Sequence, residues 1–181
     1  TIARAETIKK KTINYLAKTD IDFKEVDLFL SDGNELEAYK ESLKDYPINF
    51  IVTNKKHVNT QRNFMIDHYK EGQLVLGIDD DIQSIEMRIS EKKTMPLLNL
   101  TEFVDQAFEI SQQLKFDMWG VNAVLNPYFM RNQPEFKYGL SIITDPFSFI
   151  INNKNIKLTQ FYINENYNDN SFSDYEKSIL H

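Results

Sequence analysis

Three consecutive carboxylates, Asp79, Asp80 and Asp81, follow directly on the apolar run 74–78. The run predicts a buried strand of a parallel sheet, and ligand sites in open α/β sheets lie beyond the carboxyl ends of such strands. Because alternate residues of an extended segment point the same way, Asp79 and Asp81 can face one divalent cation while Asp80 faces elsewhere. Oxygen ligands favour Mg²⁺ or Mn²⁺, ions that commonly bind phosphates. The acid run is therefore the candidate metal site.

The alternative role of this acid run is structural. Acid clusters often close a strand as a solvated turn, or cap the following helix. The segment 84–90 alternates apolar and polar residues, which predicts another strand and leaves no helix to cap. Three adjacent like charges also repel one another unless a cation compensates them. These two observations favour the metal site over the turn.

Length and composition limit the class of protein. The 181 residues suffice for one domain with a real core, and the contents of 41% hydrophobic and 27% charged residues are typical of a soluble globular protein. No apolar run approaches the roughly 18 residues of a membrane span, and no signal peptide is recognisable. The chain has no cysteine, which excludes disulfides and thiolate chemistry and fits a cytoplasmic setting. The net charge of −6 disfavours broad nonspecific binding to nucleic acid, although a local basic groove stays open.

The expected elements are those of a doubly wound α/β domain. Helices are predicted over 6–18, 34–44 and 57–70, and strands over 25–30, 48–53 and 74–78. In the second half we expect an amphipathic helix over 98–114 and strands over 116–125, 138–144, 147–151 and 157–163. This mixed second half, 91–181, extends the sheet on the acceptor side, and 1–90 is the nucleotide-binding half. Both ends look truncated, because no strand precedes the first helix and a helix only begins at 174–181.

Four motifs in the first 90 residues resemble those of GT-A type glycosyltransferases. They are Thr1-Ile2-Ala3-Arg4, Ser31-Asp32, Gln61-Arg62-Asn63 and Ile78-Asp79-Asp80-Asp81-Ile82, the last as an Asp-x-Asp motif. The resemblance implies a single GT-A domain, with a Rossmann-like mixed sheet flanked by helices. It also implies a metal-dependent transfer of a sugar, with Mn²⁺ or Mg²⁺ and a nucleotide-sugar donor, most often a UDP-sugar.

A narrower resemblance concerns the acceptor. Asp-Asp-Asp-Ile, Trp119-Gly120 and the late Asp-Tyr-Glu at 174–176 are similar to the phage glycosyltransferases associated with TET/JBP-type base hydroxylases. This likeness implies transfer to hydroxymethylated pyrimidines in DNA, and for a phage protein the host cytoplasm as its location. Trp119 is either a core residue or a platform that stacks on a sugar.

The resemblance also implies roles for single residues. Those expected at the nucleotide-sugar are Thr1, Ala3, Arg4, Asp32, Arg62, Asn63, Asp79 and Asp80. Among them Arg62 approaches the diphosphate, and Asp79 touches the ribose or the metal. Asp81 is the principal metal ligand. In inverting members a carboxylate at a later helix start deprotonates the acceptor hydroxyl, which corresponds to Asp174 or Glu176 here.

Each of these residues has an alternative structural role. Arg4 and Arg62 could be salt-bridge partners at the surface, Asp32 could close a tight turn, and Asp174 could cap its helix. For the whole chain, a nucleotidyltransferase is disfavoured because no glycine-rich loop with Lys or Arg precedes the first helix. A catalytically inactive GT-A-like binding or scaffold domain remains the main alternative to the enzyme.

Overall fold

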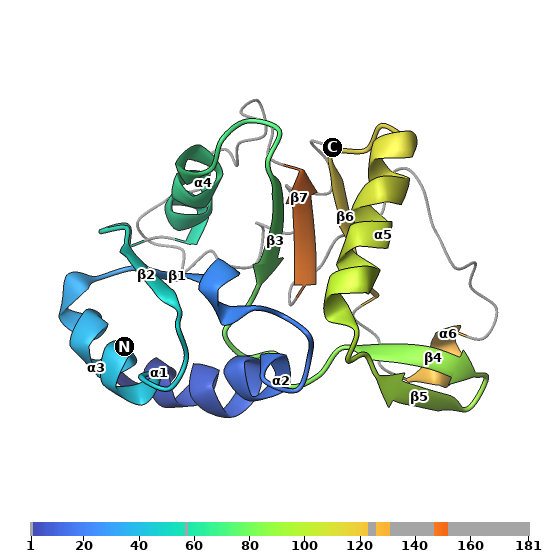
Figure 1. Ribbon diagram of the computed structural model, residues 1–181, viewed down its shortest axis with the longest axis horizontal. Helices are drawn as coiled ribbons and strands as arrows, with labels where there is room; N and C mark the ends of the chain where they lie inside the picture. Colours follow the sequence, from blue (N-terminus) through green and yellow to red (C-terminus); the bar gives the residue numbers. More distant parts are fainter. Residues whose placement is uncertain (1, 57, 123–125, 131–146, 152–181) are drawn as a thin grey trace, which may run out of the picture.

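The computed structural model describes residues 2–56, 58–122, 126–130 and 147–151. They form a mixed α/β structure in which helices and strands alternate along the first half of the chain (Figure 1). The α/β class predicted from the sequence is therefore confirmed. Within the described residues, no helix combines the length and the apolar character that a membrane span requires.

The chain begins with one helical run that widens in its middle. The run consists of α1 (Ile2–Ile8), the π-helical turn η1 (Lys9–Ile13) and α2 (Asn14–Leu16). Ile8, Ile13 and Leu16 are buried, so the apolar face is the one that the amphipathic pattern predicts. The first predicted helix is confirmed, with an earlier start. Single π-helical turns inside α-helices are rare and often lie at functional sites.

A β–α–β unit follows the first helix. Its elements are η2 (Phe23–Glu25), β1 (Asp27–Leu30), η3 (Gly33–Glu35), α3 (Leu36–Ser42) and β2 (Asn49–Val52). The two strands are parallel, with Asp27 opposite Asn49 and Leu30 opposite Val52. The chain then forms α4 (Val58–His68) and β3 (Leu74–Ile78). All of these predicted helices and strands are confirmed, which makes the alternation of helix and strand the best-predicted part of the fold.

The environment of β3 differs from the prediction. In the described part of the chain β3 pairs antiparallel with β7 (Phe147–Ile151), and β7 pairs antiparallel with β6 (Met118–Gly120), in a sheet separate from β1 and β2. The strand is also only partly buried, since Leu74 is 42% exposed. The prediction of a buried strand in a parallel sheet is therefore wrong. An apolar run fixes the strand but carries no information on the direction of its partner.

The second half is described only in part. The helix α5 (Leu100–Gln113) confirms the predicted amphipathic helix, and β7 confirms the strand predicted over 147–151. Of the strand predicted over 116–125, the described residues 116–122 contain β6, and 123–125 lie outside the described residues. A short helix, α6 (Pro127–Met130), is also described. The strands predicted over 138–144 and 157–163 lie outside the described residues.

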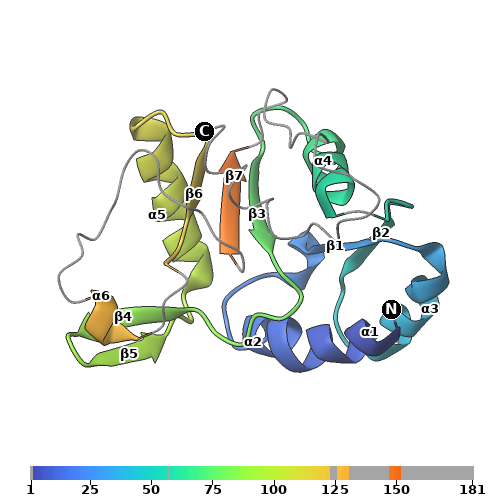
Figure 2. The ribbon, with the colours of Figure 1, turned by 180° about the vertical axis from the view of Figure 1, so that it is seen from behind.

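A hairpin connects the two halves of the chain. It consists of β4 (Glu86–Ser90), which the sequence predicts, and β5 (Lys93–Pro96), which the sequence analysis missed. Figures 1 and 2 show the hairpin at the opposite side of the molecule from β1 and β2. Met87 and Met95 face each other across the two strands and are about half exposed.

Two groups of buried side chains form the core, and the first helix contributes to both. The α5 core consists of Tyr15, Leu16, Ile82, Ile85, Leu100 and Phe108. The α3 core consists of Ala5, Ile8, Ile13, Leu30, Tyr39, Leu43 and Ile48. Phe23 packs against both cores. Asp20, just after the first helix, accepts a hydrogen bond from the Thr101 amide at the start of α5, and this bond is the main reason why the pKa of Asp20 is lowered.

Candidate acid-turn site

The three carboxylates after β3 lie in a turn and not on an extended segment. The chain leaves β3 toward the first helix (Figure 1), and Asp80 and Asp81 are the central residues of a turn that runs from Asp79 to Ile82. We call residues 79–82 the acid turn. Asp81 is exposed, whereas Asp79 and Asp80 are partly buried. The prediction that these residues form an extended segment is therefore wrong, and the alternation expected to bring Asp79 and Asp81 to one side does not apply, because it holds only for a strand.

The turn is fastened to the first helix by Thr12. The Thr12 hydroxyl donates a hydrogen bond of 2.7 Å to the carbonyl oxygen of Asp79 and accepts one of 3.0 Å from the amide of Ile82. Thr12 lies in η1 and is buried, and Ile82 is part of the α5 core. Thr12 was not predicted as a site residue. Its only signal is a polar residue on an apolar helix face, and such a residue is usually satisfied locally.

Two arginines from different helices meet the acid turn. Arg4, on α1, lies with its Nη1 3.1 Å from Oδ2 of Asp80, and Arg62, on α4, lies with its Nη2 3.9 Å from Oδ1 of Asp79. Guanidinium groups thus compensate part of the charge that the sequence analysis assigned to a cation. The two arginines predicted at the diphosphate are brought together with the Asp-x-Asp motif, but as partners of its carboxylates.

The two ion pairs differ in exposure. The Arg4 side chain is 67% exposed, and the Arg62 side chain is 20% exposed. Exposed ion pairs contribute about 0–1 kcal/mol to stability, because solvent screens the charges and the long side chains lose freedom. The exposed Arg4 is therefore held weakly enough to exchange its partner when a more highly charged ligand arrives. The Arg62–Asp79 pair is less exposed, but its distance of 3.9 Å is longer than that of a hydrogen bond.

Tyr39 is a further residue at this site that the sequence analysis missed. It lies on α3 and is 4% exposed. Burial raises the pKa of its phenol, the charge of Asp80 raises the pKa further, and the charge of Arg4 lowers it. The phenol therefore senses the charges of both members of the Arg4–Asp80 pair. The contacts to the acid turn itself come from the first helical run and from α4.

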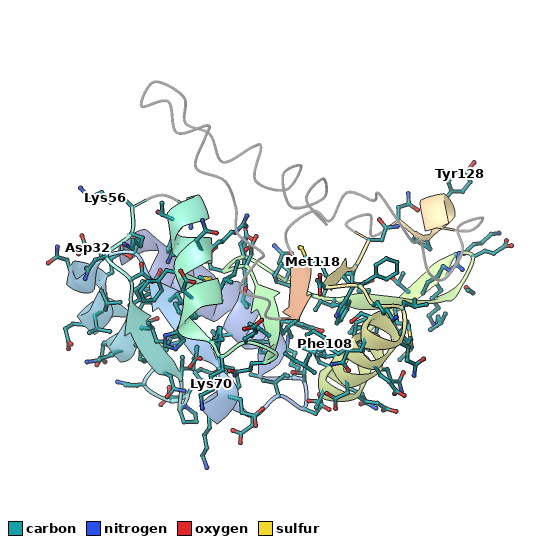
Figure 3. All side chains as sticks on the ribbon, turned by 90° about the horizontal axis from the view of Figure 1, so that it is seen from above. Asp32, Lys56, Lys70, Phe108, Met118 and Tyr128 are labelled. Atoms are coloured by element: carbon teal, nitrogen blue, oxygen red, sulfur yellow. The ribbon has the colours of Figure 1, made fainter. Side chains whose placement is uncertain are left out.

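Asp32 occupies the carboxyl end of β1, as predicted. Its carboxylate accepts hydrogen bonds from the Asn34 amide (2.9 Å) and the Asn34 side chain (3.3 Å), which caps η3. This is the turn role that the sequence left open. Since β1 and β2 are parallel, the segments after both strands lie at one edge of the sheet, and Figure 3 shows Asp32 and Lys56 on that side. Asp32 is exposed and available to a ligand.

The remaining predicted residues are placed less fully. Asn63 lies on α4 next to Arg62, and the neighbouring Gln61 donates a hydrogen bond to the carbonyl of Phe29 in β1. Ala3 lies in α1. Thr1, Asp174 and Glu176 fall outside the described residues, so the structure does not place the predicted catalytic carboxylates.

The sequence left Trp119 either a core role or a role in stacking on a sugar. Trp119 packs edge-on against Phe103 and Phe108, with ring centroids 6.0 and 5.4 Å apart, so its core role is the one observed.

Among the residues that the structure describes, no group of three or more His, Asp or Glu side chains is arranged to hold a metal ion. The carboxylates of the acid turn still have the chemistry for Mg²⁺, which is usually bound by one or two carboxylates together with phosphate oxygens and water.

Comparison with known proteins adds no relative. No protein-family model, no curated protein and no solved structure matches this chain, so its function must be inferred from the acid turn and its surroundings.

Proposed function

We propose that the chain is a metal-dependent glycosyltransferase that binds the diphosphate of a nucleotide-sugar at the acid turn. The observation that carries the proposal is the convergence of Arg4 and Arg62, from two helices, on the Asp-x-Asp motif after β3. Guanidinium groups suit the planar, bidentate recognition of phosphate, and carboxylates suit a divalent cation. The acid turn thus has groups for both parts of a metal–diphosphate ligand.

Binding would proceed by an exchange of partners. Asp81, which is exposed, and Asp79 would hold Mn²⁺ or Mg²⁺. The positive charge of this ion would neutralise the negative charge of the departing diphosphate. Arg4 and Arg62 would then turn from carboxylates to phosphate oxygens, which accept stronger charge-assisted hydrogen bonds. Asp32, at the carboxyl end of β1, would contact the base or the ribose.

The finer fold and the acceptor are parts of the same proposal. A GT-A, Rossmann-like arrangement is supported by the parallel β1–α3–β2 unit and by α4, which leads into the acid-tipped strand β3. An antiparallel neighbour of β3 fits the mixed sheet of such a fold. For the acceptor we retain the hydroxymethylated pyrimidine of DNA, with Asp174 or Glu176 as the base and the cytoplasm as the location.

The experiment is a calorimetric titration of the full chain with UDP and UDP-glucose, with and without Mn²⁺. We expect binding that requires Mn²⁺ and that is lost in Asp81→Ala. Glu91→Ala is the matched control, because Glu91 is an exposed acid in the turn of the β4–β5 hairpin. Absence of binding by the folded wild type, or equal binding by wild type and Asp81→Ala, would refute the proposed donor site.

The ion pairs favour a second candidate, a GT-A-like binding or scaffold domain without catalysis. Two of the three carboxylates already have arginine partners, and such compensation is what a purely structural turn requires. The two candidates are separated by turnover. Release of UDP from UDP-glucose in the presence of hydroxymethylated DNA supports the enzyme, whereas binding of the nucleotide without any release of UDP supports the scaffold.

A further inference from the structure

The Thr12 hydroxyl bonds to both groups that close the acid turn. In a four-residue turn, the carbonyl of the first residue and the amide of the fourth are the groups that face each other. Here these groups belong to Asp79 and Ile82, and Thr12 donates to the first and accepts from the second. One side chain, about 70 residues away in the sequence, thereby fixes the ends of the turn that carries Asp80 and Asp81.

The π-helical turn η1 brings Thr12 to this position. In a regular α-helix of 3.6 residues per turn, Thr12 would lie about 80° around the helix axis from Arg4. A π-helical turn accommodates an extra residue and so reduces that angle. Thr12 and Arg4 accordingly reach the same acid turn. The Thr12 hydroxyl bonds to backbone groups of Asp79 and Ile82, and the Arg4 guanidinium pairs with the Asp80 carboxylate. The π-helical turn η1 thus allows Thr12 and Arg4 to contact the acid turn together.

We propose that Thr12 is the positioning residue of the acid turn. Its hydroxyl holds the backbone so that Asp80 meets Arg4 and Asp79 meets Arg62, and it thereby sets the directions of the three carboxylates. The conformation of the turn depends on this hydroxyl whether or not a ligand binds. Only the consequence for binding a metal–diphosphate rests on the proposed function.

The contribution of the hydroxyl can be separated from that of packing. Thr12 is 4% exposed, so a valine of similar shape fills its space while removing both hydrogen bonds. A buried amide or carbonyl that loses its partner is costly, so we expect the turn in Thr12→Val to open toward water, which satisfies these groups. Serine retains the hydroxyl and loses only a methyl group. Thr12→Ser should therefore behave as the wild type does.

The test is hydrogen exchange of the Ile82 amide, followed by NMR on the full chain without ligand. We expect exchange in Thr12→Val to be at least about tenfold faster than in the wild type, and exchange in Thr12→Ser to be close to the wild-type rate. Thr53→Val is the matched control. Thr53 is also buried, and its hydroxyl also donates to a carbonyl, that of Leu30, and accepts from an amide, that of Lys55.

Fast exchange at Ile82 in Thr12→Val but not in Thr53→Val supports the inference. Unchanged exchange in Thr12→Val, or equal acceleration in both variants, overturns it. Should Thr12→Val not fold, Thr12→Ser decides alone, since accelerated exchange at Ile82 in this variant would assign the role to the methyl group and overturn the inference.

Binding of Mn²⁺–UDP is the second readout. We expect Thr12→Val to bind at least about tenfold more weakly, with Thr12→Ser close to the wild type. If the exchange result holds but the wild type binds no nucleotide, the proposed function fails and Thr12 keeps its role in the turn. If the wild type binds and Thr12→Val binds equally well, the consequence of Thr12 for binding fails, the proposed function stands, and hydrogen exchange at Ile82 alone decides the role of Thr12 in the turn.

Discussion

At the scale of single residues, the two arginines of the acid turn have different surroundings. Arg4 extends into solvent from the exposed side of α1, whereas the Arg62 side chain is largely covered. The aliphatic part of a covered arginine packs against its neighbours as well as carrying the charge. The stability of the fold should therefore depend more on Arg62 than on Arg4, although the Arg4–Asp80 distance is the shorter.

The first prediction compares these two residues. We expect Arg4→Ala to lower the free energy of unfolding by no more than about 0.5 kcal/mol, and Arg62→Ala by about 1 kcal/mol, because Arg62 loses packing as well as charge. Urea unfolding at low and high salt measures both effects. The loss in Arg4→Ala should vanish at 1 M NaCl, where exposed charges are screened over about 3 Å. A larger loss of unfolding free energy in Arg4→Ala than in Arg62→Ala would show that Arg62 does not contribute more to stability than Arg4.

The second prediction concerns Tyr15, which is 2% exposed and donates a hydrogen bond of 2.8 Å to the carbonyl of Leu97. Burial is the main reason why the pKa of this phenol rises from 10.0 to about 12. The folded state therefore keeps its proton at a pH where the unfolded chain loses it. The stabilisation is fully present below pH 10 and is lost as the pH rises toward 12. In that window the free energy of unfolding should fall by up to about 1.4 kcal/mol per pH unit from this group.

Urea unfolding between pH 9 and pH 12 tests this expectation. Tyr39 and Tyr69 also have raised pKa values, so the wild type should lose stability more steeply than Tyr15 alone requires. The variant Tyr15→Phe removes one ionisation and should show a shallower decline. An identical slope in wild type and Tyr15→Phe would show that Tyr15 does not retain its proton on folding.

At the scale of elements, the third prediction concerns the turn between α4 and β3. Gly72 has a φ of 81°, in the left-handed region that side chains disfavour, and a Cβ added there would meet no atom within 4 Å. Gly72→Ala should therefore cost about 1 kcal/mol through backbone strain alone. Gly33 is the matched control, because its added Cβ would meet only Val52 at an ordinary 3.8 Å.

Chemical denaturation of both variants distinguishes strain from space. Gly33→Ala should lose no stability, and by restricting the unfolded chain it should gain up to about 0.5 kcal/mol. Equal losses in Gly72→Ala and Gly33→Ala would mean that the left-handed conformation is not the cause. Gly72 follows α4, the helix that carries Arg62. If the turn only connects α4 to β3, the nucleotide affinity of Gly72→Ala should equal that of the wild type.

The sequence predicted those elements whose pattern is local. The β1–α3–β2 unit, α4 and β3 each have their own alternation or helical spacing, and all of them formed where expected. The partner of β3 did not follow from the sequence, because β7 lies some 70 residues further along and pairs from the opposite direction. The strand β5 was missed because its four residues, Lys-Thr-Met-Pro, show little alternation without β4 beside them.

The same difference between local patterns and distant contacts explains which parts of the site were predicted. The carboxylates at a strand end are visible in the sequence, whereas the two arginines were expected at the site from the resemblance. Arg4 was expected before the first helix and lies within α1. The Thr12 bonds join residues 67 and 70 positions apart, and the two ion pairs join separate helices to the turn. Such contacts depend on how the helices pack, which no local pattern encodes.

At the scale of the whole molecule, the first helix connects the two cores. Tyr15 and Leu16 belong to the α5 core, Ile8 and Ile13 belong to the α3 core, and Thr12 lies between them. Because a helix is a rigid element, a change of packing in one core displaces the other side of the same helix. The acid turn, which is fastened to this helix at Thr12, should therefore depend on the integrity of both cores.

The fourth prediction follows from that connection: the two cores should unfold in one transition. Leu43 is 0% exposed in the α3 core, and Leu43→Ala should cost about 2–5 kcal/mol through lost contacts and a cavity. Trp119, the only tryptophan, packs against the α5 core, so its fluorescence reports on the core that does not contain Leu43. If the first helix couples the cores, Leu43→Ala lowers the urea midpoint of Trp119 fluorescence as much as that of far-ultraviolet circular dichroism.

Leu98→Ala, at a position 47% exposed, should leave both midpoints unchanged. A fluorescence midpoint that stays at the wild-type value in Leu43→Ala would show that the cores unfold separately, and the acid turn would then depend on the α5 core alone, to which Ile82 belongs.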